Sequence, residues 1–159
     1  MQQGIVERYG TECFVPMRKE RRRDRHGRFA WVRLCALSSY VFVRADQDLF
    51  HRIARDAMPV RPMVRQQEGM YLPVVVPDRD MESFIRVAGS QDEQAQYLDP
   101  AKLNFKRGDR VRIVGGSLVG VEGIFMQVGG KHEKRVVIQL EGLVAVATAA
   151  IPAALVERI

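Results

Sequence analysis

The chain has 159 residues, of which 47% are hydrophobic and 28% are charged, and its formal net charge is +6. This balance is typical of a soluble globular protein, and the length has room for one ordinary domain or two small ones. No apolar run approaches the roughly 18 residues of a membrane helix, and MQQGIVERYG lacks the basic start and apolar stretch of a signal peptide. We therefore expect a soluble, cytoplasmic protein that does not span a membrane.

In chain order, the first elements alternate between helix and strand. Residues 5–9 predict the last turn of a helix, which Gly10 ends. Residues 12–23 predict a strand, the DRHG sequence at 24–27 predicts a turn, and residues 28–34 predict the returning strand of a β-hairpin.

The middle of the chain continues this pattern. A β-rich run at 39–44 precedes a predicted helix at 46–58, whose apolar residues recur at helical spacing until Pro59 stops it. Two extended segments, 60–66 and 70–77, flank a predicted Glu-Gly turn.

A second helix is predicted at 78–89, beginning at Pro-Asp and ending at glycine. Its predicted apolar face consists of Met81, Phe84, Ile85 and Ala88. The polar stretch 90–105 has no sustained periodicity, and we interpret it as a linker between two domains.

After residue 106 the chain predicts short strands only. The five predicted strands, separated by glycine-containing turns, are RVRIV, EGIFMQV, KRVVIQL, LVAVATA and ALVERI. Because glycine permits positive φ angles and close strand approach, these short strands predict a small, strongly bent β-barrel. The predicted fold class is α+β, with an N-terminal α/β domain linked to a five-stranded barrel.

Positive charge is concentrated in residues 18–33, on the predicted hairpin. This segment holds eight lysines or arginines against two acidic residues, a net charge of +6, so the rest of the chain sums to zero. Clustered positive charge favours a polyanionic partner, because each neutralised phosphate releases condensed counterions. A solvated hairpin tip kept soluble by arginine is an equally good interpretation of the charge alone.

Residues 108–125 read GDRVRIVGGSLVGVEGIF, and their glycines have two interpretations. A phosphate-binding loop places its glycines between a strand and a helix, whose N-terminus faces the anion. Here the glycines lie between two predicted strands, and the GxGxxG frame is absent. The segment therefore predicts the corner of a barrel.

No pattern in the sequence predicts catalysis, a metal site or a cofactor. His26, His51 and His132 are dispersed, and no nucleophile–base order or carboxylate pair in an apolar run is present. Cys13 and Cys35 have no metal-ligand spacing, and we expect two reduced, mostly buried thiols. The sequence predicts a binding protein and not an enzyme.

The glycine-rich segment resembles the KOW motif, in which a strand, a G-x-x-x-G loop and a second strand follow Gly-Asp. The structural residues that match it are Gly108, Asp109, Gly116, Gly120 and Gly123. Upstream, ECFVPM, the basic hairpin, YVFVR and LPVVVPDRDMESF resemble the N-terminal domain of NusG-family transcription factors. The resemblance implies a NusG-type domain at 1–89, a linker at 90–105 and a five-stranded KOW barrel at 106–159.

Within that family, CFVPMRKE and the ending EGLVAVATAAIPAALVERI are most similar to the UpxY group, antiterminators tied to bacterial capsular polysaccharide operons. The resemblance implies binding to the clamp helices of RNA polymerase through an apolar depression, which suppresses pausing and termination. The residues that it implies for this depression are Leu37, Tyr40, Phe42 and Phe14. By family analogy, the KOW domain binds a second protein, such as a ribosomal protein or a termination factor.

The same resemblance implies two further contacts in the elongation complex. His51 and Arg52 are placed opposite the other wall of the polymerase cleft, with a solvated helix face as the alternative interpretation. The hairpin arginines are placed near nucleic acid, where they would contact phosphates without reading sequence. These arginines are Arg21, Arg22, Arg23, Arg25 and Arg28.

Family members open with a strand and a full helix, whereas this sequence begins near the end of that helix. We therefore expect one of three situations: a start internal to a longer gene, another segment in place of the strand, or strand exchange in a homodimer. Two other functions stay open. They are a housekeeping elongation factor that supports termination, and a ribosome-associated KOW protein that binds structured RNA.

Overall fold

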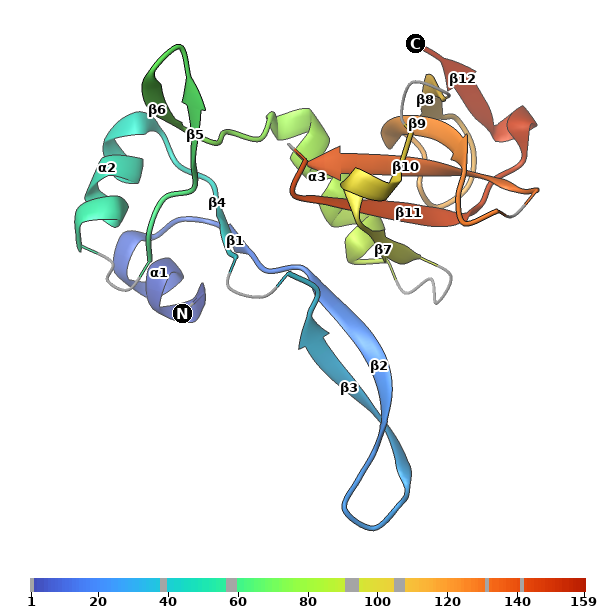
Figure 1. The fold of residues 1–159 in the computed structure, drawn as a ribbon, viewed down its shortest axis with the longest axis horizontal. Coiled ribbons are helices and arrows are strands. Elements are labelled where there is room, and N and C mark those ends of the chain that lie inside the picture. Colours follow the sequence, from blue (N-terminus) through green and yellow to red (C-terminus); the bar gives the residue numbers. More distant parts are fainter. Residues whose placement is uncertain are drawn as a thin grey trace. The chain divides into compact units, whose positions relative to one another are not determined.

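The computed structural model describes residues 2–37, 40–56, 60–90, 95–104, 108–130, 132–140 and 142–159 (Figure 1). Over these residues it combines three α-helices with antiparallel strands, so the predicted α+β class is confirmed. The chain divides into two compact units: Met1–Pro16 with Leu37–Val75, and Met17–Ala36 with Val76–Ile159. None of the helices in the described ranges has the length and apolar character needed to span a membrane.

The first unit contains two helices and two short antiparallel strand pairs. Its elements are α1 (Gln2–Tyr9), β1 (Cys13–Phe14), β4 (Phe42–Val43), α2 (Gln47–Asp56), β5 (Val64–Gln67) and β6 (Met70–Pro73). β1 pairs with β4, and β5 pairs with β6. The two helices contact each other, and Ile5 of α1 and Ile53 of α2 are buried, as expected for the core of a small unit.

The boundaries of α1 and α2 follow signals in the sequence. Gly10 has a φ angle of 62°, and its N–H donates to the carbonyl oxygen of Val6 at 2.9 Å, which ends α1. Asp46 caps α2, because its Oδ1 accepts a hydrogen bond from the N–H of Leu49 at 2.8 Å. Pro59, predicted to stop α2, lies outside the described residues.

The second unit contains an antiparallel sheet of six strands in the order β12-β8-β9-β10-β11-β7. Five of them are the predicted strands: β8 (Asp109–Ile113), β9 (Glu122–Gln127), β10 (Lys134–Leu140), β11 (Val144–Ala150) and β12 (Val156–Arg158). The sixth, β7 (Gln96–Leu98), lies within the predicted linker 90–105. The linker prediction is wrong for these residues, because Tyr97 and Leu98 pair with β11 and extend the sheet.

Helix α3 (Asp78–Ala88) packs on β9, β10 and β11 and belongs to the second unit. The predicted N-terminal domain, 1–89, includes this helix, so that boundary is corrected: the compact unit resumes at Val76. The predicted apolar face is also partly wrong, because Ile85 is 38% exposed whereas Phe84 and Val87 are fully buried. Phe84 and Val87 are three residues apart and therefore share the face that meets the sheet.

The glycines of the predicted motif shape the connection between β8 and β9. Gly116 and Gly120 have φ angles of 84° and 86°, in the left-handed region that favours glycine. Gly123 lies in β9, where an added Cβ would stand 2.6 Å from the carbonyl oxygen of Val137 in β10. A Cβ on Gly108 would likewise collide with a side chain of β9. These glycines turn the chain or permit close approach, and a strand, not a helix, follows the loop.

The basic hairpin consists of β2 (Met17–Arg23) and β3 (Phe29–Cys35), as predicted. Asp24 organises its turn, because its Oδ1 accepts hydrogen bonds from the backbone N–H groups of His26 at 2.8 Å and Arg28 at 2.9 Å. The two strands therefore form a regular ladder closed by an aspartate-capped turn.

The two cysteines are less buried than predicted. Cys13 in β1 is half-buried, and its partial burial raises the pKa of its thiol above the ordinary value. Cys35 is the last residue of β3, where it pairs with Met17, and it is exposed. The prediction of two mostly buried thiols is therefore wrong.

Candidate functional site

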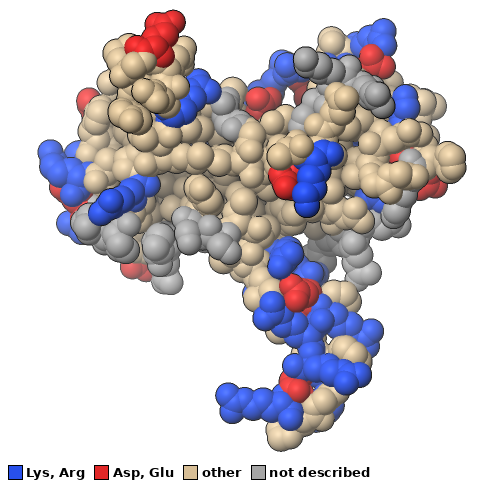
Figure 2. Space-filling model, in the orientation of Figure 1, with Lys and Arg blue, Asp and Glu red and all other residues tan. Residues whose placement is uncertain are grey.

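The basic hairpin presents different side chains on its two faces. In an antiparallel ladder, residues directly opposite each other point to the same side. One face, here called the aromatic face, consists of the pairs Lys19 with Arg33, Arg21 with Trp31, and Arg23 with Phe29. All six side chains are exposed, and lysines and arginines crowd the surface of the hairpin (Figure 2).

Aromatic rings and guanidinium groups lie together on the aromatic face. The Cζ atoms of Arg21 and Arg23 lie 4.4 and 4.9 Å from the ring centroid of Phe29, within cation–π range. Phe29 is 52% exposed and Trp31 is 65% exposed, so neither ring is explained by core packing. Neither ring is among the predicted site residues, although their spacing of two within a predicted strand already puts them on one face.

The opposite face of the hairpin has a different chemistry. Glu20 forms ion pairs there with Arg18 at 3.3 Å and with Arg22 at 2.9 Å. Val32 and Leu34 are half-buried on the same face. Glu20 reduces the net charge of the strands on this face to +1, whereas Lys19, Arg21, Arg23 and Arg33 give the aromatic face a charge of +4.

The structure separates the five predicted nucleic-acid-binding arginines, all of which are exposed. Arg21 and Arg23 lie on the aromatic face, and Arg22 lies on the opposite face. Arg25 and Arg28 belong to the turn, where Arg28 forms an ion pair with an aspartate at 3.3 Å. The cluster that the sequence shows as one group is therefore divided between two faces and a turn.

In the first unit, Phe14 and Phe42 are direct partners in the β1–β4 pair. The structure thus brings together two of the predicted polymerase-binding residues, both half-buried. Tyr40 precedes β4 and is 42% exposed, and Leu37 is half-buried. Partly exposed aromatic residues of this kind are enriched in protein–protein interfaces.

His51 and Arg52 lie side by side on α2 and are exposed, whereas the next residue, Ile53, is buried. The His51 ring packs edge-to-face against Phe50, with ring centroids 5.6 Å apart. The helix therefore presents both predicted cleft-contact residues to solvent.

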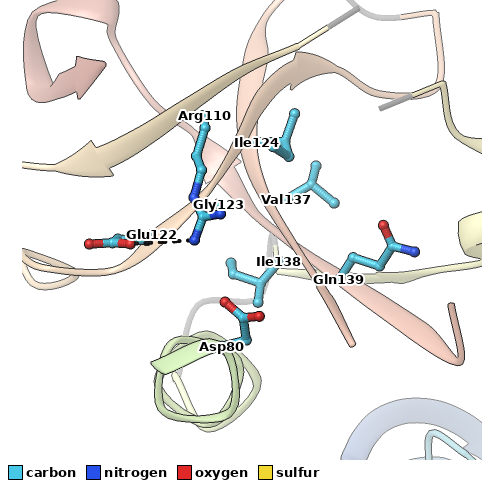
Figure 3. A pocket seen from close by; sticks show the side chains of 8 residues that line it. All are labelled: Asp80, Arg110, Glu122, Gly123, Ile124, Val137, Ile138 and Gln139. Atoms are coloured by element: carbon cyan, nitrogen blue, oxygen red, sulfur yellow. Dashed lines mark ion pairs between the residues drawn. The ribbon is translucent and has the colours of Figure 1, made fainter. Parts of the chain in front are cut away.

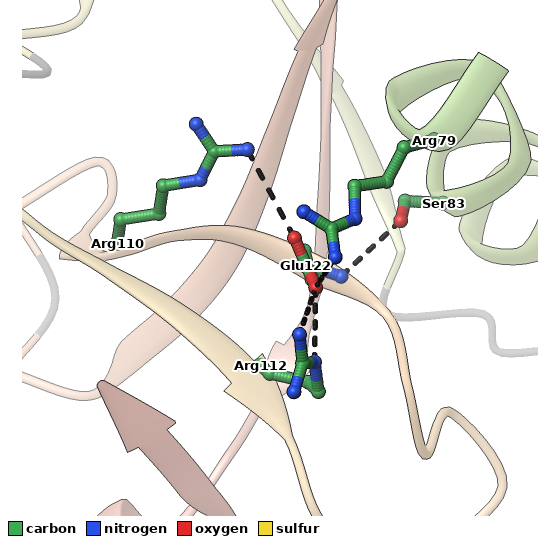
Figure 4. Close-up of polar contacts among 5 residues, drawn as sticks. All are labelled: Arg79, Ser83, Arg110, Arg112 and Glu122. Atoms are coloured by element: carbon green, nitrogen blue, oxygen red, sulfur yellow. Dashed lines mark hydrogen bonds and ion pairs between the residues drawn. The ribbon is translucent and has the colours of Figure 1, made fainter. Parts of the chain in front are cut away.

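A buried carboxylate joins α3 to the sheet (Figure 4). The Glu122 side chain is 4% exposed, and its Oε1 accepts hydrogen bonds from Nε and Nη2 of Arg112 at 2.9 and 2.7 Å. Nη2 of Arg79 in α3 lies 3.2 Å from the same oxygen, and Nη2 of Arg110 lies 3.9 Å from Oε2. The Glu122 backbone N–H donates to Oγ of Ser83 at 3.2 Å. Three guanidinium groups thus balance one buried charge.

A cavity of about 170 Å³ lies next to this cluster, between α3 and strands β9 and β10 (Figure 3). Its lining residues are Asp80, Arg110, Glu122, Gly123, Ile124, Val137, Ile138 and Gln139. Of its three charged lining residues, Arg110 and Glu122 are paired with each other. We interpret the cavity as part of the joint between helix and sheet and assign no ligand to it.

Other ionisable groups of the second unit serve structural contacts. Asp109, the first residue of β8, accepts a hydrogen bond from the side chain of Arg158 in β12. The hydroxyl of Tyr97 donates to the carbonyl oxygen of Met17 at 3.1 Å, and burial raises the pKa of Tyr97 to about 12. Within the described ranges, no three His, Cys, Asp or Glu side chains gather in a group that would hold a metal ion.

The chain was compared with protein-family models and with curated proteins. None of the family models and none of the curated proteins matches it. The hairpin and the Phe14–Phe42 pair are the two surfaces from which a function can be inferred.

Proposed function

We propose that this protein is a transcription elongation regulator that binds RNA polymerase and promotes antitermination, like the UpxY group of NusG-family proteins. The observation that carries the proposal is the basic hairpin, whose exposed arginines contribute to no core and are available to phosphates. The sequence resemblance supplies the polymerase as the partner that would bring the hairpin to nucleic acid. Capsular polysaccharide operons are the proposed targets.

The proposed polymerase contact is the aromatic surface of the first unit. Phe14 and Phe42 supply apolar area as neighbours in the β1–β4 pair, and Tyr40 adds an exposed ring with a hydroxyl group. Leu37 completes the set, and His51 on the exposed side of α2 offers a second contact with its neighbour Arg52. The six-stranded sheet with α3 is the proposed counterpart of the KOW domain, and it would bind a further protein.

The test is an elongation assay with bacterial RNA polymerase on a template that carries a terminator. We expect the full chain to increase read-through and Tyr40→Ala to lose most of this increase, because the exposed ring is removed from the contact. Tyr71→Ala is the matched control, since Tyr71 is 71% exposed in β6 of the same unit but lies outside the proposed contact.

Two outcomes would contradict the proposal and select an alternative. Unchanged read-through together with tight binding to structured RNA would indicate a ribosome-associated RNA-binding protein. Increased termination in the presence of a termination factor would indicate a housekeeping elongation factor.

A further inference from the structure

We propose that the aromatic face of the hairpin is a stacking platform for single-stranded nucleic acid. Unpaired bases lie on Phe29 and Trp31, and the surrounding lysine and arginines contact the phosphates. The inference deepens the proposed function, on which its place in transcription rests. The sequence predicts only phosphate contacts for this surface, and the inference adds unpaired bases as the groups that the rings bind.

The first argument is the exposure of the two rings. Trp31 and Phe29 present more than half of their surface to solvent, although burial would be the favourable state for such side chains. A base that stacks on an exposed aromatic ring contributes roughly 1–3 kcal/mol to binding and does so for any base, because every base has a π face. The platform therefore predicts binding with little sequence preference.

The second argument is the spacing of the rings. Two residues along a strand span about 6.6 Å, roughly twice the 3.4 Å between successive bases in duplex DNA. Phe29 and Trp31 can therefore each receive a base only when the bases are spread apart. A single strand can spread in this way without breaking base pairs, whereas a duplex must open first.

The third argument is the position of the charges. Each ring has an arginine directly across the ladder, Arg21 opposite Trp31 and Arg23 opposite Phe29. Both guanidinium groups also lie within 5 Å of the Phe29 centroid, at 4.4 and 4.9 Å. None of the six residues of the aromatic face is acidic, while Glu20 points to the other side. Phosphates linked to stacked bases would therefore meet four positive charges on the aromatic face, against a net charge of +1 on the opposite face.

Trp31 is the single tryptophan of the chain, so intrinsic fluorescence reports directly on the proposed contact. We would titrate the full chain with oligo-dT and with oligo-rU of about 15 nucleotides, which cover one site. A duplex of equal length and heparin, a polyanion without bases, are the comparison ligands. We expect saturable quenching by the single strands and little quenching by duplex or heparin. The two single strands distinguish DNA from RNA as the source.

Variants assign the binding energy to the aromatic face. Affinity for labelled oligo-dT, measured by anisotropy, should fall on the order of 5- to 150-fold in Trp31→Leu. Replacing Arg21 and Arg23 by serine should weaken binding and reduce the salt slope by about 1.4. The charge-matched control replaces Arg18 and Arg22, which lie on the opposite face with Glu20, and it should have a smaller effect. Circular dichroism verifies that each variant is folded.

Three outcomes would overturn the inference. If the two double-serine variants weaken binding equally and no tryptophan quenching occurs, the hairpin binds nucleic acid only through non-specific electrostatic attraction. Duplex binding as tight as single-strand binding would indicate insertion of the ribbon into a groove. Absence of binding to every nucleic acid would leave polymerase binding untouched, because the elongation assay tests that contact through Tyr40 in the other unit.

Discussion

The β2–β3 hairpin and the β10–β11 pair are both antiparallel ladders of seven-residue strands, but they differ in burial. Ten of the fourteen residues in β10 and β11 are buried, whereas none of the fourteen in β2 and β3 is. Helix α3 covers one face of β10–β11, where the ring of Phe84 lies 6.3 Å from that of Tyr97. Val137, Ala145 and Ala147 pack in an apolar cluster on the other face.

This difference shows which residues serve folding and which are available for binding. Burial of apolar surface, at about 25 cal/mol per Å², explains the valines and alanines of β10 and β11. The hairpin gains little from burial, and its cross-strand pairs are worth roughly 0.2–1 kcal/mol each. The ring of Trp31, which is 65% exposed, is therefore not explained by burial on folding, and the proposed stacking platform gives it a role.

The largest expected effect lies at the buried contact between α3 and the sheet. Phe84→Ala should lower the free energy of unfolding by about 3–5 kcal/mol, because it leaves a cavity where the ring is fully buried. Ile85→Ala, on the next residue of the helix and 38% exposed, is the matched control and should cost less than about 1 kcal/mol. Urea denaturation followed by circular dichroism measures both. Equal losses would contradict the described packing of α3.

The next effect concerns the charge that joins α3 to the sheet. Glu122→Gln keeps the shape but removes the carboxylate that three arginines surround, and we expect a loss of roughly 2–3 kcal/mol. This is less than for a fully buried pair, because the arginine side chains are 40–61% exposed. Glu157→Gln in β12 removes an exposed carboxylate and should change stability by less than about 0.5 kcal/mol. If Glu122→Gln leaves the free energy of unfolding unchanged in the same assay, the ion pairs of Glu122 with the three arginines do not stabilise the fold.

A pH-dependent effect is expected at Tyr97, which packs in the sheet and donates to β2. Its pKa is about 12 in the folded protein and about 10 when unfolded. Between these values the folded state binds more protons, so the free energy of unfolding falls as the pH rises from 10 to 12. Tyr97→Phe should lack this contribution. Thermal unfolding at stepped pH compares the two proteins, and identical pH profiles would contradict the buried phenol.

The smallest expected effect on stability is at Trp31, in the exposed hairpin that is compared with the buried β10–β11 pair. Trp31→Leu, the variant expected to weaken nucleic-acid binding, should change the free energy of unfolding by less than about 1 kcal/mol. The reason is that the ring is 65% exposed, so its removal costs little buried apolar area. The denaturation assay used for Phe84→Ala measures it. A loss comparable to that of Phe84→Ala would assign Trp31 a structural role.

Local sequence signals predicted most of the elements but fewer of their partners. Asp46, Gly10 and the Asp24 turn all act within a few residues of the chain, so the elements they bound were predictable. The strand at 96–98 was not predictable, because Tyr97 and Leu98 lie in a polar stretch without strand periodicity. They form a strand only by pairing with β11, which is distant in sequence. The predicted face of α3 was right at Phe84 but included the exposed Ile85 and missed the buried Val87, because the spacing of apolar residues does not show which of them meet the sheet.

The candidate site shows the same division. The concentration of arginine at residues 18–33 is a property of composition, and the sequence alone indicates a polyanionic partner. Alternation along the strand puts Arg22 and Glu20 on the other face from Arg21 and Arg23, and cross-strand register decides that Arg21 lies across from Trp31 and Arg23 across from Phe29. The register also decides that Trp31 and Phe29 share a face with unpaired charge.

The sequence by itself determined the α+β class, the hairpin, the five late strands and the location of the positive charge. These depend on periodicity, turn chemistry and composition, which act over short distances along the chain. Only the tertiary structure decided that α3 joins the late sheet and that Glu122 is buried against it. It also decided which hairpin face carries the rings. Contacts between distant residues determine these features, because burial and cross-strand pairing depend on which segments meet.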